Sequence, residues 1–151
     1  MRVRILAFFS VILTALALVP SAAHFFELPN KIAMTEEQYF VAQSIYRGWA
    51  QFGFVLGAAL VANTAFAVAL RRRRAAALLA GAGALAIALV FVVFFVWVYP
   101  ANLATAYWTL ATDNWQSLRR DWEYAHAANA LITFFGLSAV TLAALLAREA
   151  R

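Results

Sequence analysis

Four long apolar segments fill most of this 151-residue chain and restrict it to a small set of folds. They cover residues 5–26, 49–70, 75–99 and 124–147. Crossing the ~30 Å hydrocarbon layer of a bilayer takes about 20 helical residues, and each segment is long enough. None alternates apolar and polar residues as a barrel strand does, and a helix closes its own hydrogen bonds in lipid. The sequence predicts an all-α membrane protein, a bundle of four transmembrane helices forming a single domain over residues 1–151.

The composition of the chain is too apolar to include a separate soluble domain. Hydrophobic residues make up 66% of the chain and charged residues 13%, which is far from the composition of ordinary soluble domains. The formal net charge is +5, but the basic residues cluster beside the apolar segments, where they set orientation and meet lipid headgroups. We therefore expect a lipid bilayer as the partner and no nucleic acid. The chain has no cysteine, which excludes disulfides, thiolate metal sites and iron–sulfur clusters.

The basic residues also predict the orientation in the membrane. With a cytoplasmic N-terminus, the inner side carries Arg2, Arg4, Arg71, Arg72, Arg73, Arg74, Arg148 and Arg151, and the outer side carries Lys31, Arg47, Arg119 and Arg120. Eight basic residues inside against four outside satisfy the positive-inside rule. The sequence predicts a multi-pass protein of the bacterial inner (plasma) membrane with both termini cytoplasmic. The inner loop is expected at 71–74 and the outer loops at 27–48 and 100–123.

The first segment has a second interpretation. Its basic start, its apolar stretch and the small residues at 21–23 also resemble a secretory signal with a cleavage site. Cleavage would leave His24 at the N-terminus. The apolar stretch continues through Phe25 and Phe26, which favours a retained span.

The two halves of the chain are faintly alike. Pro29 and an Arg-x-Trp at 47–49 correspond to Pro100 and an Arg-x-Trp at 120–122. Each half is expected to be a helix that ends at a proline, a polar outer loop and a second helix. This pattern predicts two tandem helical hairpins, related by an axis along the membrane normal that would bring both outer loops together. Trp and Arg at these places are also ordinary interfacial anchors.

Small and polar residues in the first two segments predict how the helices pack. Gly53 and Gly57 form a Gly-x-x-x-Gly pair that lets another helix approach closely, and a homo-oligomer through this face is one expectation. Asn63 is expected to hydrogen-bond across a helix interface. Pro20 is expected to kink the first helix below His24.

Both histidines have a carboxylate three residues away. His24 and Glu27 share a helix face at the outer end of the first segment, and Glu123 and His126 do so at the start of the fourth. Glu-x-x-His is one element of di-iron bundles, but the other helices offer no glutamates to complete that site. Three alternatives stay open: one metal ion held by these four residues, a haem between the two imidazoles, and metal-free acid–base chemistry by a histidine.

The same pairs have a structural interpretation. Near the interface a charge costs much less than the ~2.5–3.5 kcal/mol of the helix centre. Glu27 or Glu123 could therefore pair with Arg47, Arg119 or Arg120 and clamp the outer helix ends.

Aromatic side chains are dense at the same level of the chain. They are Phe25, Phe26, Tyr39, Tyr46, Trp49, Trp97, Tyr99, Tyr107, Trp108, Trp115, Trp122 and Tyr124. Many belong to an interfacial aromatic belt. The others could wall a flat apolar pocket for a polycyclic aromatic or quinone-like small molecule.

The second half carries a recognisable pattern. Pro100-Ala101-Asn102-Leu103 ends the third segment, and Trp115, Arg119, Trp122-Glu123 and His126 lead into the fourth. This pattern resembles the small four-helix integral membrane family, mostly of unknown function, that includes the anthrone oxygenases of polyketide pathways. The Pro-x-Asn motif and the Trp…Trp-x-x-x-His stretch of that family correspond to Pro100, Asn102, Trp115, Trp122 and His126. Asn129 stands where relatives often carry arginine.

The resemblance implies an oxidation of an anthrone- or quinol-like substrate with dioxygen at the extracytoplasmic end. His126 is the expected base, Glu123 would orient its ring, and Asn102 or Arg119 would stabilise the developing oxyanion. The expected substrate-binding wall consists of Trp122, Trp115, Trp49 and Tyr99. The reaction would need no cofactor or a single metal ion or haem. The competing classes are a non-catalytic membrane scaffold or subunit and a haem- or metal-binding membrane protein.

Overall fold

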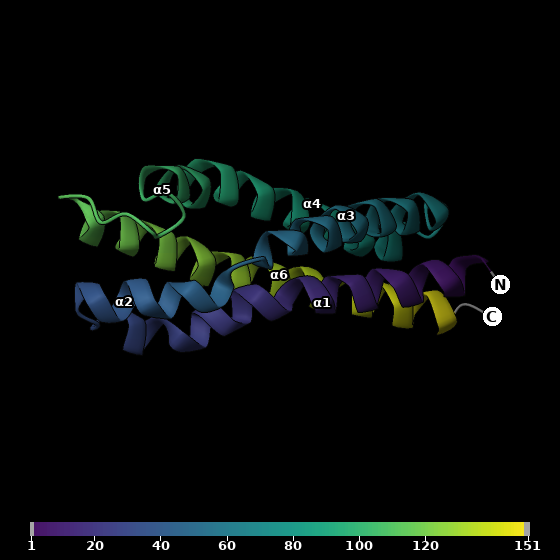
Figure 1. The fold of residues 1–151 in the computed structure, drawn as a ribbon. Coiled ribbons are helices and arrows are strands. Elements are labelled where there is room, and N and C mark those ends of the chain that lie inside the picture. Colours follow the sequence, from purple (N-terminus) through teal and green to yellow (C-terminus); the bar gives the residue numbers. More distant parts are fainter. Residues whose placement is uncertain (1, 150–151) are drawn as a thin grey trace.

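The computed structural model describes residues 2–149, and within them the chain is all-α (Figure 1). Four helical stretches are long and apolar enough to cross a membrane, namely Arg2–Lys31, Trp49–Ala69, Arg74–Ala104 and Trp115–Ala147. The predicted four-helix bundle is confirmed, and it is compatible with a multi-pass membrane protein. Arg151, which the topology prediction counts on the inner side, lies outside the described residues.

The four long helices form a ring in which each packs against two others. α1 (Arg2–Lys31) packs against α3 (Phe52–Ala69) and α6 (Trp115–Glu149). α4 (Arg74–Val93) packs against the same two helices. Consecutive spans run in opposite directions along the bundle (Figure 1), so α1 with α3 and α4 with α6 form the two hairpins expected from the sequence.

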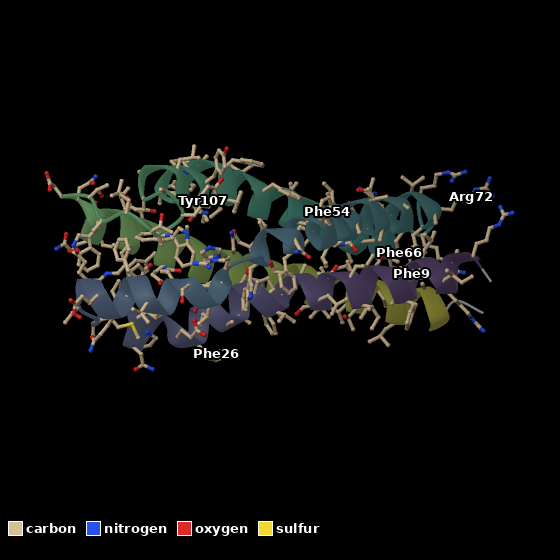
Figure 2. All side chains as sticks on the ribbon, viewed as in Figure 1. Phe9, Phe26, Phe54, Phe66, Arg72 and Tyr107 are labelled. Carbon is tan, nitrogen blue, oxygen red and sulfur yellow. The ribbon has the colours of Figure 1, made fainter. Side chains whose placement is uncertain are left out.

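The two ends of the bundle differ in chemistry. The start of α1, the end of α6 and the α3–α4 loop lie together at one end, where Arg72 points away from the helices (Figures 1 and 2). We call this the arginine end and the opposite one the histidine end. At the histidine end the long helices are joined and covered by short elements, which are α2 (Glu36–Gln43), η1 (Ser44–Tyr46), η2 (Trp49–Gln51) and α5 (Tyr99–Ala104).

Along its spans the bundle buries several polar side chains among small and apolar ones, and its outer surface is apolar. Ser10, Thr14 and Asn63 are fully buried, whereas Phe54 and Phe135 are more than half exposed. The Asn63 Nδ2 on α3 donates to the Thr14 Oγ1 on α1 at 3.1 Å, which confirms the predicted bond across a helix interface. Lipid solvates apolar faces and leaves polar groups to pair between helices, so this distribution is the one expected of a bundle in a bilayer.

The close contact between α4 and α6 depends on Gly83 and Gly136. A Cβ on Gly136 would lie 2.8 Å from the Cβ of Ala86, and a Cβ on Gly83 would collide with a side chain of α6. The sequence prediction of close packing at Gly53 and Gly57 is wrong for the described chain, because a Cβ at either position meets nothing within 4 Å. A homo-oligomer through that face stays a prediction.

Gly136→Ala should lower the stability of the bundle by about 1–3 kcal/mol, the usual cost of overpacking. The Cβ of Ala86 is fixed to its own helix, so α4 and α6 must separate to admit the new methyl group. Gly53→Ala adds the same methyl group in open space, and it should be neutral or stabilising by up to about 1 kcal/mol. Thermal unfolding followed by circular dichroism in detergent micelles would separate the two variants. Equal unfolding midpoints would contradict the close approach.

Neither of the two outer prolines ends its helix, contrary to the sequence prediction. α1 runs through Pro29 to Lys31, and it is continuous through Pro20. The third span continues from α4 through a π-helical turn, η3 (Phe94–Val98), into α5, which contains Pro100. Proline lacks a backbone donor, and the wider turn just before it accommodates the missing hydrogen bond. The helical third span therefore ends at Ala104 and not near residue 99.

The fourth span also begins earlier than predicted. α6 starts at Trp115, within the predicted outer loop 100–123, and is continuous to Glu149. The polar residues 116–123 form the first turns of this helix, and hydropathy alone reports only the part that crosses lipid. The consequence for the site is that Trp122 and Glu123 are held on the same rigid helix as His126.

Candidate functional site

The two histidines of the chain lie in contact at the histidine end. The ring centroids of His24 on α1 and His126 on α6 are 4.3 Å apart. The Trp122 ring lies 4.2 Å from His126 and 4.8 Å from His24, and Tyr46 and Trp49 lie 4.3 and 5.9 Å from His24. We call these five side chains the histidine cluster. His24 is buried, whereas His126, Tyr46 and Trp49 are half-buried, so the cluster reaches the surface of the bundle.

His24 keeps an unused polar atom inside the cluster. Its Nδ1 is buried and has no hydrogen-bond partner in residues 2–149. The Oε2 of Glu27 lies 4.0 Å from this nitrogen, beyond hydrogen-bond distance, and accepts a hydrogen bond from the Tyr46 hydroxyl. A buried polar atom without a partner costs about 1–3 kcal/mol. The Nδ1 is therefore a group that a ligand in the cluster could satisfy.

A buried ion pair lies beside the histidine cluster. The Lys31 Nζ is 2.7 Å from the Oε1 of Glu123, and the two side chains are 3% and 0% exposed. The Tyr39 hydroxyl donates to the same carboxylate oxygen at 3.0 Å, and the Gln43 amide donates to that hydroxyl at 2.5 Å. The Oε2 of Glu123 is buried without a partner among the described residues. Separating the two residues would leave each charge buried without its partner, which costs several kcal/mol. The ion pair therefore holds α1 against α6.

The ammonium group of Lys31 connects the ion pair to the histidine cluster. Its Nζ lies 4.5 Å from the ring centroid of Tyr46 and 4.9 Å from that of Trp122. A cation over an aromatic face is attracted by the ring quadrupole, by about 2 kcal/mol where both are desolvated. The cluster therefore combines neutral imidazoles and aromatic walls with one buried positive charge at its edge.

Two tyrosines of the connecting segment stay neutral. Burial raises the pKa of Tyr39, and the charge of the Glu123 carboxylate raises it further. Burial also raises the pKa of Tyr46, with its hydrogen bond to Glu27 as the second cause. Both hydroxyl groups therefore act as hydrogen-bond donors near neutral pH, and neither serves as a general base.

Asn102 on α5 accepts hydrogen bonds from two indoles, one on α6 and one in the turn after α5. The Nε1 groups of Trp122 and Trp108 donate to its Oδ1 at 2.8 and 3.1 Å. An indole N–H can only donate, so the side-chain oxygen of Asn102 must face both rings. Asn102 thus fixes the indole that packs against His126. The structure gives it this positioning role, whereas the sequence suggested that it stabilises an oxyanion.

The turn after α5 has an unusual backbone. Ala106, Tyr107 and Trp108 have φ angles of 46°, 57° and 61°, in the left-handed region that residues with a Cβ rarely adopt. The Tyr107 N–H donates to the backbone oxygen of Asn102 at 2.6 Å, and the Trp108 N–H donates to the Thr105 hydroxyl at 3.0 Å. These bonds hold the strained turn and bury Trp108 against the site.

Asn102→Ala should leave both indole N–H groups without their partner and destabilise the protein by about 1–3 kcal/mol for each buried donor. Trp122 and Trp108 would then lose their fixed positions, and the tryptophan emission should shift to the red. Asn30→Ala is the control, since Asn30 is exposed near the end of α1. An emission maximum and unfolding midpoint equal to those of the control would contradict the positioning role.

Arg119 lies beside a second aromatic group. Its Nη1 donates to the backbone oxygens of Met34 and Lys31 at 2.7 and 3.5 Å. Its guanidinium covers the rings of Trp115 and Tyr39 at 4.6 and 5.3 Å. Arg119 therefore clamps α6 to the turn after α1 through backbone oxygens. The structural interpretation of the sequence paired it with Glu27 or Glu123, but Glu123 pairs with Lys31.

The four side chains predicted to bind substrate do not gather in one place. Trp122 and Trp49 belong to the histidine cluster. Trp115 packs against Tyr39, 6.1 Å away, and Tyr99 packs against Phe94 with 38% of its surface exposed. The structure thus places only two of the four at the histidines.

The structure does not assemble the predicted metal-ligand set of His24, Glu27, Glu123 and His126. Within residues 2–147, whose side chains the structure describes, no three His, Cys, Asp or Glu side chains group closely enough to hold a metal ion. The reason is that Lys31 and Tyr39 bind Glu123, while the Tyr46 hydroxyl binds Glu27. Glu123 also forms no hydrogen bond with His126 in the described chain, so it does not orient that ring as predicted. The contact between the two imidazole rings leaves no space for a porphyrin between them.

Sequence reasoning missed Lys31 and Gln43 as parts of the site, and it named Tyr39 only as one of many aromatic residues at this level. Lys31 follows His24 by seven residues, two helical turns, so both lie on one face of α1. That spacing would have revealed Lys31 had α1 been extended past Pro29. Tyr39 and Gln43 carried no such signal, because they depend on α2 lying beside the outer part of α1 (Figure 1).

Fold and site together define the class of this protein. It is an apolar four-helix bundle with a histidine–aromatic cluster and a buried ion pair at one end. No protein-family model, no curated protein and no solved structure matches this chain. The relation to the anthrone-oxygenase family therefore rests on the sequence resemblance alone.

Proposed function

We propose that this protein oxidises flat aromatic compounds of the anthrone or hydroquinone type with dioxygen, without a bound cofactor. The observation that carries the proposal is the histidine cluster, in which two imidazoles touch inside a wall of tryptophan and tyrosine rings. The buried Nδ1 of His24 has no partner in the described chain, as expected of a group reserved for a ligand. The resemblance to the anthrone-oxygenase family supports the same reaction.

His126 is the proposed base. Its half-buried ring lies at the edge of the cluster, and the unprotonated nitrogen of an imidazole can accept a proton as a general base. It would take a proton from the acidic CH₂ of an anthrone and leave a carbanion. The electron pair of the carbanion would pass to dioxygen, giving a carbon-bound hydroperoxide after reprotonation. Loss of water from the hydroperoxide would then form the quinone carbonyl, so one dioxygen yields one quinone and one water.

Lys31 is the proposed stabiliser of the oxyanion that forms on the substrate. Its ammonium is fixed at the edge of the cluster over Tyr46 and Trp122. A preorganised charge away from water stabilises a developing negative charge more strongly than a hydrated one. Of the two residues that the sequence suggested for this role, Arg119 donates to two backbone oxygens and Asn102 accepts from two indoles.

We further propose that the arginine end faces the cytoplasm of a bacterial cell and that the histidine cluster lies at the extracytoplasmic side of the inner membrane. The support is the positive-inside rule, applied to the arginines of the α3–α4 loop and of the N-terminus. An apolar planar substrate would dissolve in the lipid and approach the half-buried edge of the cluster from there.

The test is a turnover assay on purified protein in detergent with a panel of anthrones and hydroquinones. Dioxygen uptake and quinone absorbance should rise together above the rate in buffer, and a chelator should leave the rate unchanged. Metal analysis and an absorption spectrum of the same sample separate the metal and haem alternatives. The proposal fails if no compound is turned over, or if the rate follows the metal or haem content.

A non-catalytic scaffold is the second candidate. The observation that favours it is that Lys31, Glu123 and Arg119 all bind other groups of the protein and join α1 to α6. A scaffold predicts that replacing both histidines by phenylalanine changes stability only. The turnover assay distinguishes the two candidates directly.

A further inference from the structure

A second potential binding site lies at the arginine end, at the opposite end of the bundle from the histidine cluster. An open cavity of about 850 Å³ is formed there by the first turns of α1, the α3–α4 loop with the end of α3, and the last turns of α6. Among the side chains that the structure describes, every charged one that lines it is an arginine, namely Arg4, Arg71, Arg72 and Arg73. Four like charges around one cavity are complementary to an anion.

The rest of the cavity is apolar. Along α1 its wall continues from Arg4 through Phe8 to Ile12, a distance of about 12 Å along the helix. The side chains of Phe8 and Ile12 are 59% and 41% exposed. These residues belong to an apolar span, so their exposed faces lie at the depth of lipid chains. The cavity therefore combines a cationic mouth with an apolar wall that extends toward the middle of the bundle.

Two of the arginines are fixed in place by the protein. The Arg73 guanidinium donates to the backbone oxygen of Ala147 at 2.5 Å, and that of Arg71 donates to the backbone oxygen of Val68 at 3.4 Å. A guanidinium has five N–H donors, so each keeps several for a ligand. Arg72 extends beyond the helix ends (Figure 2), at the level where headgroups lie.

We propose that this cavity binds an anionic phospholipid, with the phosphate among the arginines and one acyl chain along Phe8 and Ile12. A free phosphate would satisfy the mouth but leave the apolar wall uncovered. A zwitterionic lipid would cover the wall but bring a cation to the mouth. Basic pockets between transmembrane helices are known to select anionic headgroups.

The test uses native mass spectrometry of the purified protein in detergent with phosphatidylglycerol or phosphatidylcholine of identical chains. The wild type should retain phosphatidylglycerol preferentially. Arg4→Gln/Arg71→Gln should weaken its binding by about 25-fold, taking about fivefold for each arginine. Arg74→Gln is the matched control, because Arg74 belongs to the same arginine run but does not line the cavity, and it should change binding by less than about twofold.

Three results would overturn the proposal. Equal retention of both lipids by the wild type would show that the headgroup is not recognised, whatever the variants do. An equal loss in Arg74→Gln would show attraction to the general surface charge. Displacement of the lipid by millimolar inorganic phosphate would show a site for the free anion. Unfolding midpoints of both variants check that each is folded.

Discussion

His126→Ala is expected to reduce the rate of quinone formation by about 10²–10⁴-fold, the contribution of a general base. His126 offers the accessible imidazole of the histidine cluster, and the pKa values of the neighbouring tyrosines are raised too far for either to replace it. The effect should fall mainly on kcat, because the variant retains Trp122 and Trp49, which we propose to bind the substrate. Added imidazole should restore part of the rate if the missing group is the base.

Tyr124→Ala is the matched control for this experiment. Tyr124 precedes His126 by two residues on α6, and 56% of its surface is exposed. Its loss should leave the rate within about twofold of the wild type, since surface substitutions away from a site change little. Full activity in His126→Ala with unchanged folding would reject the proposed base.

Lys31→Met is expected to destabilise the protein by about 3–5 kcal/mol, because it leaves the buried carboxylate of Glu123 without its cation. Glu123→Leu should cost a similar amount by leaving the ammonium unpaired. The double variant Lys31→Met/Glu123→Leu removes both charges and should recover most of the stability, since apolar residues of similar size often replace a buried ion pair without loss. Chemical unfolding of the three variants in micelles measures the coupling.

The double variant also tests the catalytic role proposed for Lys31. If its ammonium stabilises the oxyanion, the folded double variant should lose about 10²–10³-fold in kcat, the usual effect of removing one such donor. Restored stability with full activity would limit Lys31 to a structural role. Single variants as stable as the wild type would contradict the buried ion pair itself.

The four spans were predictable because crossing lipid requires about 20 apolar residues, whatever their tertiary contacts. Their ends were not predictable in the same way. Pro29 and Pro100 suggested helix ends, yet α1 continues to Lys31 and the third span continues through a π-helical turn. The polar residues 116–123 suggested a loop, yet they extend α6. A hydropathy pattern reports the solvent around a helix, and it does not report where the backbone stops being helical.

That His24 and His126 lie close together could be expected from their depth in the membrane, since both lie near the same end of their spans. Which residue pairs with Glu123 could not be expected from depth alone. It depends on the rotation of α1 and α6 about their axes, which turns Glu123 toward Lys31 and Tyr39. Local spacing places Glu123 and His126 on one helix face, but it cannot decide which neighbouring chain segment that face meets.

The length of α1 sets the depth at which the histidine cluster lies in a membrane. At 1.5 Å per residue, His24 lies about 30 Å from Arg4, at the edge of the hydrocarbon layer, and Lys31 lies about 40 Å from it. The backbone of Lys31 thus stands roughly 10 Å further out, at the headgroup level, and its side chain reaches back to Glu123 beside the cluster. A bilayer only a few Å thicker would raise its acyl chains over the imidazoles, and a thinner one would leave them to water. Hydrophobic mismatch would then decide how wet the histidine cluster is in each membrane.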